Sequence, residues 1–289
     1  RKSKEFFKMK ILYVGVFTNN STNIGQAEAL DKVSDLSTFD MRDIGSYSLK
    51  QRDEAILNIV KNDTPDLLLI SKGNTINIDV VKKAKEYCKV ACWYMDPLVN
   101  ADSEWMEKVK HSDYIFSAYE KLANIFRETN SNSYYLQEGF HPTLHRPMKL
   151  EKVYDTTFVG YLKDHRGGYF QQVGFKNFNN SYGNEYTKVV NQSRINLGFT
   201  TNKEGTSDRV YKVLACGSFF LTEKWELMEN DWEAGEDFIT FDNITDCKDK
   251  ISYYLKNAKE RHEIAEQGRK KVQKYSTTNW AKTIIEAVK

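Results

Sequence analysis

Segments of two kinds alternate along most of this chain: short apolar segments of strand length, and segments in which apolar residues recur at helical spacing. Strands separated by helices run parallel, because a parallel neighbour requires a long crossover connection. Apolar runs without polar alternation are typical of a sheet buried on both faces. In the first half of the chain the predicted strands are 9–16, 36–41, 66–71, 90–94, 114–118 and 133–137, and the predicted helices are 25–35, 48–61, 79–89, 102–111 and 119–128.

A second series of the same kind follows a break. Residues 138–147 contain one glycine and two prolines, a combination typical of a linker. After it come predicted strands at 158–161, 195–199, 219–221 and 238–241 and predicted helices at 210–216, 246–255, 258–275 and 278–288. We therefore expect an α/β protein with an N-terminal domain at 1–147, a C-terminal domain at 148–275 and a terminal helical segment at 276–289.

Composition narrows the functional classes. The 289 residues include 42 Lys and Arg and 40 Asp and Glu, so the formal charge is +2 and gives no support to a nucleic acid or an anionic membrane as partner. The four cysteines, Cys88, Cys92, Cys216 and Cys247, form no C-x-x-C pair and predict reduced thiols in a cytoplasmic protein. No apolar run approaches the roughly 18 residues of a membrane-spanning helix.

Polar residues follow the predicted strands of the first domain, where ligands of parallel sheets bind. They include Asn23, Asn74 and Asp96. A carboxylate at a strand end, such as Asp96, can act as a general base or hold a sugar hydroxyl, although a turn aspartate before Pro97 is the alternative. The loop at 18–24 lacks G-x-G-x-x-G, which argues against a dinucleotide cofactor, and a plain surface connection explains it equally well.

A polar loop, a short helix and an apolar strand follow one another without a break between 204 and 222. Ser207 or Asp208 is a suitable N-cap, and Gly217 can supply the left-handed residue that ends the helix. Backbone N–H groups at the helix start suit a phosphate, and Arg209 in the first turn can add a bidentate contact. A solvated helix start is the alternative interpretation.

A second basic segment follows the predicted strand at 158–161. Arg166, Gly167 and Gly168 are predicted to lie in its loop. The glycines allow close approach of the backbone to a ligand, and the Arg166 guanidinium offers a fork for phosphate. A flexible basic loop is the alternative.

Several of these segments resemble one family. The pattern of the chain between about 110 and 275 is similar to that of CgeB-like (spore-maturation-type) glycosyltransferases, which have the GT-B fold. That fold consists of two Rossmann-like parallel-sheet domains facing across a cleft, with a C-terminal helix crossing back to the N-terminal domain. The resemblance rests on 113–116, 145–147, 154–160, 193–197, 209–222, 235–239, 251–255, 260–261 and 264–272.

The resemblance implies roles for individual residues. The N-terminal domain would face the acceptor and the C-terminal domain would bind a nucleotide sugar, which is a substrate and not a cofactor. The linker would approach the substrate with His141 or His145, for which a structural or solvent-facing role is the alternative. The implied catalytic residues are Glu204 and Asp96, the donor-binding residues are Gly160, Arg166, Ser207, Asp208, Arg209 and Lys212, and the acceptor-side residues are Asn23, Asn74 and His141.

The chain departs from the family pattern at two places. The family carries Glu-x7-Glu, but here Glu204 is followed at the second position by Lys212, which cannot accept ribose hydroxyl protons and favours phosphate or a neighbouring carboxylate. The segment 169–190 is shorter than in the family, so the second sheet is expected to be trimmed. How the nucleobase end of a donor would be held is therefore left open by the resemblance.

These observations predict a metal-independent glycosyltransferase whose acceptor is a glycan, a small molecule or DNA. No D-x-D triplet is present to hold a metal, and fixed cations can stabilise the leaving diphosphate instead. A DNA-base glycosyltransferase or nucleic-acid-binding protein is one alternative, which basic side chains clustered at the cleft mouth would favour. A non-catalytic nucleotide- or sugar-binding protein is another, and donor hydrolysis would exclude it.

Overall fold

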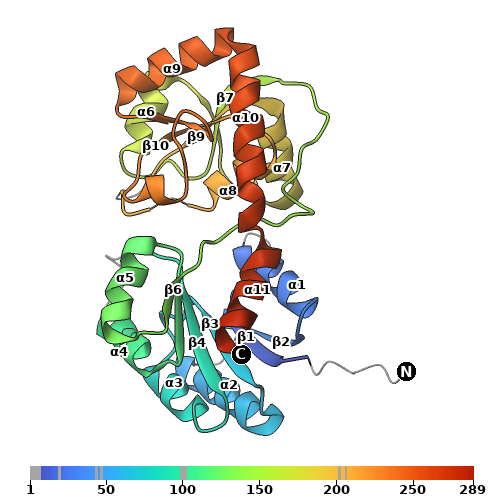
Figure 1. Ribbon diagram of the computed structural model, residues 1–289, viewed down its shortest axis with the longest axis vertical. Helices are drawn as coiled ribbons and strands as arrows, with labels where there is room; N and C mark the ends of the chain where they lie inside the picture. Colours follow the sequence, from blue (N-terminus) through green and yellow to red (C-terminus); the bar gives the residue numbers. More distant parts are fainter. Residues whose placement is uncertain are drawn as a thin grey trace. The chain divides into compact units, whose positions relative to one another are not determined.

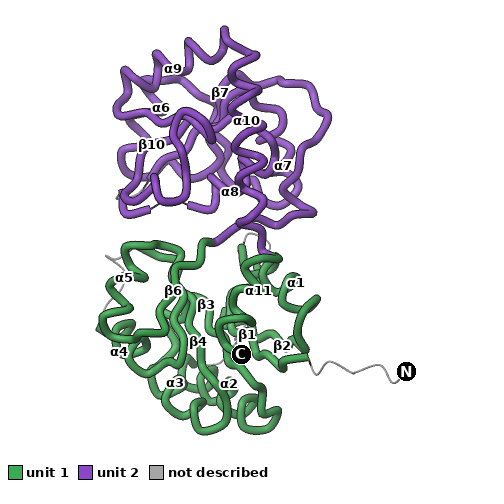
Figure 2. The backbone as a smooth tube through the Cα atoms, viewed as in Figure 1, with its two compact units in different colours: residues 1–137, 278–289 green, residues 138–277 purple. Residues whose placement is uncertain are grey.

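The protein folds into two compact units (Figure 2). The computed structural model describes residues 8–18, 21–42, 45, 48–97, 103–200, 203–205 and 207–289. Unit 1 comprises Arg1–Gln137 together with Thr278–Lys289, and unit 2 comprises Glu138–Thr277. The last helix of the chain thus belongs to the unit that contains the first strand.

Unit 1 contains a 6-stranded parallel sheet in the order β2-β1-β3-β4-β5-β6. Its strands are β1 (Lys10–Gly15), β2 (Asp35–Asp40), β3 (Leu67–Ser71), β4 (Lys89–Tyr94), β5 (Tyr114–Ser117) and β6 (Ser133–Tyr135). Its helices are α1 (Thr22–Asp31), α2 (Leu49–Asp63), α3 (Ile78–Ala84), α4 (Ser103–His111), α5 (Glu120–Thr129) and α11 (Thr277–Val288). Each strand from β1 to β5 is thus followed by a helix, as the alternation predicted, and β6 leads into the linker.

The unit 1 sheet is buried on both faces because successive side chains of a strand point to opposite sides. Leu12 and Val14 of β1 pack in a core with residues of α2, α3, α4 and α5. Ile11 and Tyr13 pack on the other face with α1 and α11, where Trp280 meets Trp93 edge to face with ring centroids 5.4 Å apart. Figure 1 shows α11 beside α1 in this layer. The crossing-back of the final helix therefore completes the core of unit 1.

Unit 2 contains a 5-stranded parallel sheet in the order β11-β10-β9-β7-β8. Its strands are β7 (Tyr154–Val159), β8 (Lys176–Phe178), β9 (Ser193–Gly198), β10 (Phe220–Glu223) and β11 (Ile239–Phe241). Its helices are α6 (Arg166–Val173), α7 (Gly183–Gln192), α8 (Arg209–Ala215), α9 (Ile244–Lys256) and α10 (Ala258–Val272), with short 3₁₀ turns at Met228–Asn230 and Gln273–Tyr275. Its two apolar cores lie on opposite faces, one lined by α7 and α8 and the other by α6 and α9.

The two sheets share one topology, since in each the first strand of the unit has the second on one side and the third on the other. The strand order reverses between β1 and β3 in unit 1 and between β7 and β9 in unit 2. Ligands of open parallel sheets bind beyond the carboxyl ends of the strands at such a switch point. The fold thus defines one candidate binding position in each unit.

One predicted loop is wrong. Arg166, Gly167 and Gly168 form the first turn of α6 and not a loop after β7. Glycine is a poor helix former, which is why the pair indicated a loop, but here both glycines have negative φ and Tyr169 of the same helix is buried in the core. Tertiary packing of the following residues therefore fixes the helix start.

Two further predictions concern the chain as a whole. Cys88, Cys92, Cys216 and Cys247 are all free thiols. Among the described residues, no helix combines the length and the apolar character that crossing a membrane requires.

Candidate functional site

Arg209 lies at the carboxyl end of β7, at the switch point of unit 2. Its Nε donates to the Val159 carbonyl at 2.8 Å, and its guanidinium carbon lies 5.0 Å from the Phe158 ring centroid. Gly160 has φ +151°, and a Cβ at this position would lie 2.6 Å from Arg209 Nη2. A glycine is therefore needed here, because any side chain would displace the guanidinium.

Arg166, the first residue of α6, lies beside the same ring. Its guanidinium carbon is 5.8 Å from the Phe158 centroid, and its Nη1 donates to the Tyr161 carbonyl at 3.4 Å. Burial and then the charge of Arg209 lower the pKa of Arg166. Arg209 itself has no carboxylate partner among the described residues. The structure therefore brings together two cations, whose mutual repulsion an anionic ligand would relieve.

Ser207 and Asp208 precede α8, and of these two predicted caps Ser207 accepts from the first helical backbone N–H, that of Arg209, with its Oγ at 3.4 Å. Asp208 occupies the N-cap position without a capping hydrogen bond and instead pairs with Lys212 one turn later. Ser207 Oγ accepts from Arg209 Nη1 at 2.6 Å. The cation on the next turn competes for the Asp208 carboxylate, so ion pairing replaces capping. Gly217, at φ +63°, ends the helix in the left-handed conformation as predicted.

Lys212 is already engaged by unit 2. Besides pairing with Asp208, its Nζ lies 5.6 Å from the centroid of the buried Tyr186 ring. Burial raises the pKa of Asp208, but the charges of Lys212 and Arg209 outweigh it, so the net pKa is lowered. A phosphate would therefore have to compete with Asp208 for Lys212, and the predicted donor contact of Lys212 stays a prediction.

Glu223, at the end of β10, is a residue of this edge that sequence reasoning missed. It accepts from His165 Nε2 at 2.9 Å and from the Thr200 backbone N–H at 2.8 Å. It thereby ties together the segments that follow β7, β9 and β10. An acidic residue directly after an apolar strand was the available signal. Glu204 is half-buried in the segment after β9, between residues 201–202 and 206, which lie outside the described part of the chain.

Asn23 lies at the switch point of unit 1 and is 2% exposed. Its Oδ1 accepts from the Val16 backbone N–H at 3.0 Å. Its Nδ2 lies 2.7 Å from Tyr13 Oη, 2.8 Å from Gln26 Oε1 and 2.8 Å from Ser71 Oγ. These contacts give Asn23 a role in holding the loop after β1, and its acceptor contact stays a prediction. Residues 19 and 20 of that loop lie outside the described residues.

Asp96 and Asn74 both lie beyond carboxyl ends of unit 1 strands. Lys72 Nζ lies 3.0 Å from Asp96 Oδ2, which links the segments after β3 and β4. Asn74 Oδ1 accepts from Trp105 Nε1 at 3.1 Å. Lys72 and Gly73 are both in the left-handed region, at φ +64° and +59°. The structure thus places Lys72 beside Asp96, a pairing that the sequence did not predict.

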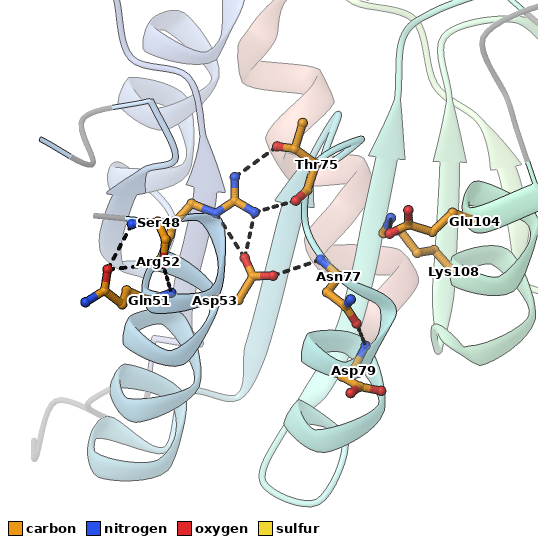
Figure 3. A network of polar contacts seen from close by, with 9 residues as sticks. All are labelled: Ser48, Gln51, Arg52, Asp53, Thr75, Asn77, Asp79, Glu104 and Lys108. Carbon is orange, nitrogen blue, oxygen red and sulfur yellow. Dashed lines mark hydrogen bonds and ion pairs between the residues drawn. The ribbon is translucent and has the colours of Figure 1, made fainter. Parts of the chain in front are cut away.

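A buried arginine fixes the same β3–α3 segment (Figure 3). Arg52 of α2 is 1% exposed, and its guanidinium donates to Asp53 Oδ1 at 2.6 Å, Thr75 Oγ1 at 2.9 Å and the Thr75 carbonyl at 2.5 Å. Asp53 Oδ2 in turn accepts from the Asn77 backbone N–H at 3.0 Å. Because the buried Arg52–Asp53 pair makes all of these hydrogen bonds, it fixes the backbone conformation of the segment. Asn74 is therefore presented by a rigid segment.

The two linker histidines lie together in unit 2. The His141 backbone N–H donates to His145 Nδ1 at 3.0 Å, and His141 Nδ1 lies 3.1 Å from Thr143 Oγ1. His145 is buried, and burial followed by the charge of Lys212 lowers its pKa to about 2. His145 is thus a neutral structural residue, whereas the acceptor role of His141 stays a prediction.

Comparison with known proteins adds a family. The model of the family described as "Glycosyl transferase-like" matches residues 142–286, which is half of the chain. The chain belongs to this glycosyl transferase-like family. A comparison with curated proteins found no match.

Solved structures with the same fold include three bacterial proteins. HepE from Anabaena in complex with UDP and glucose aligns with TM-score 0.72 and 10% identity, covering 97% of this chain and 99% of that chain. Sucrose-phosphate synthase from Thermosynechococcus elongatus aligns with TM-score 0.73 and 10% identity, covering 96% and 98%. A glycosyltransferase from Rickettsia africae aligns with TM-score 0.69 and 11% identity, covering 98% of each chain. The fold of this glycosyl transferase-like protein is therefore GT-B, as expected.

Proposed function

We propose that this glycosyl transferase-like protein moves a sugar from a nucleoside diphosphate sugar to an acceptor without a metal ion, as a CgeB-like member of the family. The observation that carries the proposal is the pair of arginines over one Phe158 ring at the switch point of unit 2. A diphosphate offers the two paired cations acceptor oxygens in the geometry that guanidinium groups bind bidentately.

The same arginines account for the chemistry. When the bond between the anomeric carbon and the diphosphate oxygen breaks, negative charge grows on the leaving oxygen. Fixed donors aimed at that charge stabilise the transition state, because they need no reorganisation during the reaction. Arg209 meets this requirement, since Val159 and Ser207 hold its guanidinium in place.

The remaining groups are assigned to the sugar and the acceptor. We assign Glu204, which is half-buried after β9, to the orientation of the sugar. Asp96 would accept the proton of the acceptor hydroxyl, for which it must exchange its contact with Lys72. Asn74, held by Trp105, and His141 are proposed to contact the acceptor.

The solved relatives of the fold support the donor class. HepE has been crystallised with UDP and with UDP-glucose. At 8–10% identity HepE shares the fold with this chain but few of its residues. The HepE complexes therefore support a nucleotide sugar as the donor class, but they do not identify its base or its sugar.

A donor screen followed by hydrolysis tests the proposal. UDP-, GDP-, ADP-, TDP- and CMP-sugars are screened by thermal shift, and each sugar that binds is then incubated with the enzyme while release of the free nucleotide is measured. We expect a stabilising donor that is slowly hydrolysed by wild type and not by Arg209→Ala. Stabilisation by none of the donors would contradict the proposal.

One observation favours a second candidate, a non-catalytic nucleotide-sugar-binding protein. Position 212, where the family pattern has a carboxylate, holds a lysine paired with Asp208. A binding protein would show the same donor stabilisation with no nucleotide release. The hydrolysis step of the screen therefore separates the two candidates.

A further inference from the structure

Two exposed tyrosines lie with their hydroxyl groups together at the edge of unit 2. Tyr161 is 48% exposed and Tyr182 is 38% exposed. Tyr161 Oη donates to Asn180 Oδ1 at 2.7 Å, Tyr182 Oη donates to the same atom at 3.4 Å, and the two hydroxyl oxygens are 3.4 Å apart. We call Tyr161, Asn180 and Tyr182 the tyrosine platform. Its rings are held by their polar tips, which leaves ring surface open to solvent.

The tyrosine platform adjoins the arginine pair. Tyr161 follows Gly160 at the end of β7, and its carbonyl accepts from Arg166 Nη1. Asn180 and Tyr182 lie between β8 and α7, and the Gly160 N–H bonds the Phe178 carbonyl at 2.9 Å, which joins the two segments. A ligand whose phosphates bind Arg166 therefore has the rings within reach of its next chemical group.

Two further side chains border the platform. Lys163 Nζ lies 5.9 Å from the Tyr161 centroid, so a cation shares one face of that ring. Asn180 uses its Oδ1 to accept from both hydroxyl groups, and its amide NH2 is a hydrogen-bond donor at the same place. An exposed aromatic residue by itself is ordinary, but two tyrosines whose hydroxyl groups share one acceptor beside the arginine pair present two ring surfaces with linked polar edges.

We propose that the tyrosine platform stacks the nucleobase of the donor. The inference rests on the proposed function, and it deepens it by assigning the base-binding residues of that site. A planar base matches the open aromatic surface, and stacking accepts any base because each has a π face. Asn180 and Tyr182 also lie in the segment 169–190, where the chain departs from the resembled family and the resemblance leaves open how the base is held.

The test compares ligands with and without a base. Dissociation constants of UDP, GDP, ADP and inorganic pyrophosphate are measured by calorimetry for wild type, Tyr161→Leu, Tyr182→Leu and the double variant. Tyr161→Phe and Tyr182→Phe keep the rings and remove the hydroxyl groups. The matched control is Tyr253→Leu, since Tyr253 is 50% exposed in α9 of the same unit and also donates its hydroxyl, to Glu260 Oε2 at 2.8 Å.

We expect the double Leu variant to bind the preferred nucleoside diphosphate about 5- to 100-fold more weakly, the range that stacking of one base contributes. Pyrophosphate affinity should stay within about twofold, and Tyr253→Leu should change neither. An equal loss for pyrophosphate and nucleotide, or no loss for either, would overturn the inference. Loss confined to nucleotide sugars, with free diphosphates unaffected, would show that the rings hold the sugar and would overturn it as well.

The same measurements separate this inference from the proposed function. Nucleotide binding that depends on Arg166 and Arg209 but not on the tyrosines overturns the platform alone. No binding of any nucleotide or pyrophosphate by wild type overturns both.

Saturation-transfer NMR provides a readout that a purely structural role of the tyrosines would not change. With the preferred nucleotide, base protons should receive more saturation than ribose protons in wild type and in the Phe variants. In the double Leu variant this preference should disappear. Stronger saturation of the ribose than of the base in wild type would contradict stacking.

Discussion

The two units use the same strand order and the same switch point, yet the strand ends there are occupied by opposite chemistry. In unit 1 the neutral amide of Asn23 is buried and bonds four partners. In unit 2 Arg166 and Arg209 lie over Phe158, and like charges are held together. One topology thus provides a buried, neutral, hydrogen-bonded strand end in one case and a charged one in the other. The binding function lies in a few side chains and not in the fold.

The two switch points differ physically in what their polar groups contact. The Asn23 side chain forms its hydrogen bonds inside unit 1, and burial raises the pKa of Tyr13 so that its hydroxyl keeps the proton it donates to Gln26. The two guanidinium groups of the arginine pair lie against one ring, so an anionic ligand would relieve their mutual repulsion. We therefore expect substitutions at the first position to change stability and those at the second to change affinity.

The largest effect is expected from Asn23→Ala. The substitution leaves the buried Val16 N–H without its acceptor and removes the contacts of Asn23 Nδ2 with Tyr13, Gln26 and Ser71, which should lower the unfolding free energy of unit 1 by roughly 2–4 kcal/mol. Denaturant unfolding measures the loss, and calorimetry should show unchanged diphosphate affinity in the folded protein. Asn62→Ala, an exposed position in α2, is the control. If Asn23→Ala left the stability of unit 1 unchanged and weakened diphosphate binding, the expected roles of the two switch points would be wrong.

Arg209→Ala and Arg166→Ala should show the opposite behaviour. Each removes hydrogen bonds to a charged ligand, so each should weaken nucleoside diphosphate binding by about 1.5–3 kcal/mol. Titration calorimetry measures this, with Arg194→Ala as a control, because Arg194 pairs with Asp155 elsewhere on unit 2. Equal nucleoside diphosphate affinities in wild type and both variants would show that the switch point of unit 2 does not bind the diphosphate.

Acid should destabilise unit 2 through His145. The folded pKa of about 2 lies below the usual unfolded value of 6.5, so only the unfolded chain gains a proton between them. The stabilisation is complete above pH 6.5 and falls as the pH decreases, by roughly 2 kcal/mol at pH 5.

Denaturant unfolding at a series of pH values tests this for His145→Gln. The variant should have a flatter pH dependence than wild type in the unit 2 transition, whereas His262→Gln, an exposed position in α10, should match wild type. Identical slopes for His145→Gln and wild type would contradict the buried neutral imidazole.

Lys212→Glu should have a smaller effect. It places a carboxylate beside Asp208 and near the arginine pair, so diphosphate affinity should fall by about 0.5–1 kcal/mol. The affinities for a nucleoside diphosphate and its 2′,3′-dideoxy analogue are compared in wild type, Lys212→Gln and Lys212→Glu. Tighter binding by the Glu variant, with strong discrimination against the dideoxy analogue, would show that position 212 still contacts the ribose.

The smallest effect is expected from removal of divalent metals. If Arg166 and Arg209 supply the positive charge of the transition state, donor hydrolysis should be unchanged by EDTA. Release of the free nucleotide measures this. Loss of activity that Mn²⁺ or Mg²⁺ restores would show that the arginine pair is insufficient and that unit 2 uses a metal as well.

The fold was predictable because its signal is local and repeated. Strands such as β3, with every residue buried, appear in the sequence as uninterrupted apolar runs, and Gly217 was predicted to end α8 because few other residues adopt positive φ. The start of α6 was not predictable in this way, since glycines at 167 and 168 indicate a loop and only the packing of Tyr169 makes them helical.

The sequence by itself determined two parallel α/β sheets, because hydrophobic periodicity acts over a few residues. Its local patterns offered Arg209 and Arg166 as anion-binding candidates, and the family resemblance added Gly160. Only the tertiary structure decided the partners: Phe158 under both arginines, Asp208 on Lys212, Glu223 joining three strand ends, and the buried network around Asn23. Each polar side chain has several possible partners along the chain. The register of strands far apart in sequence selects one of them, since a hydrogen bond or ion pair forms only within about 3–4 Å.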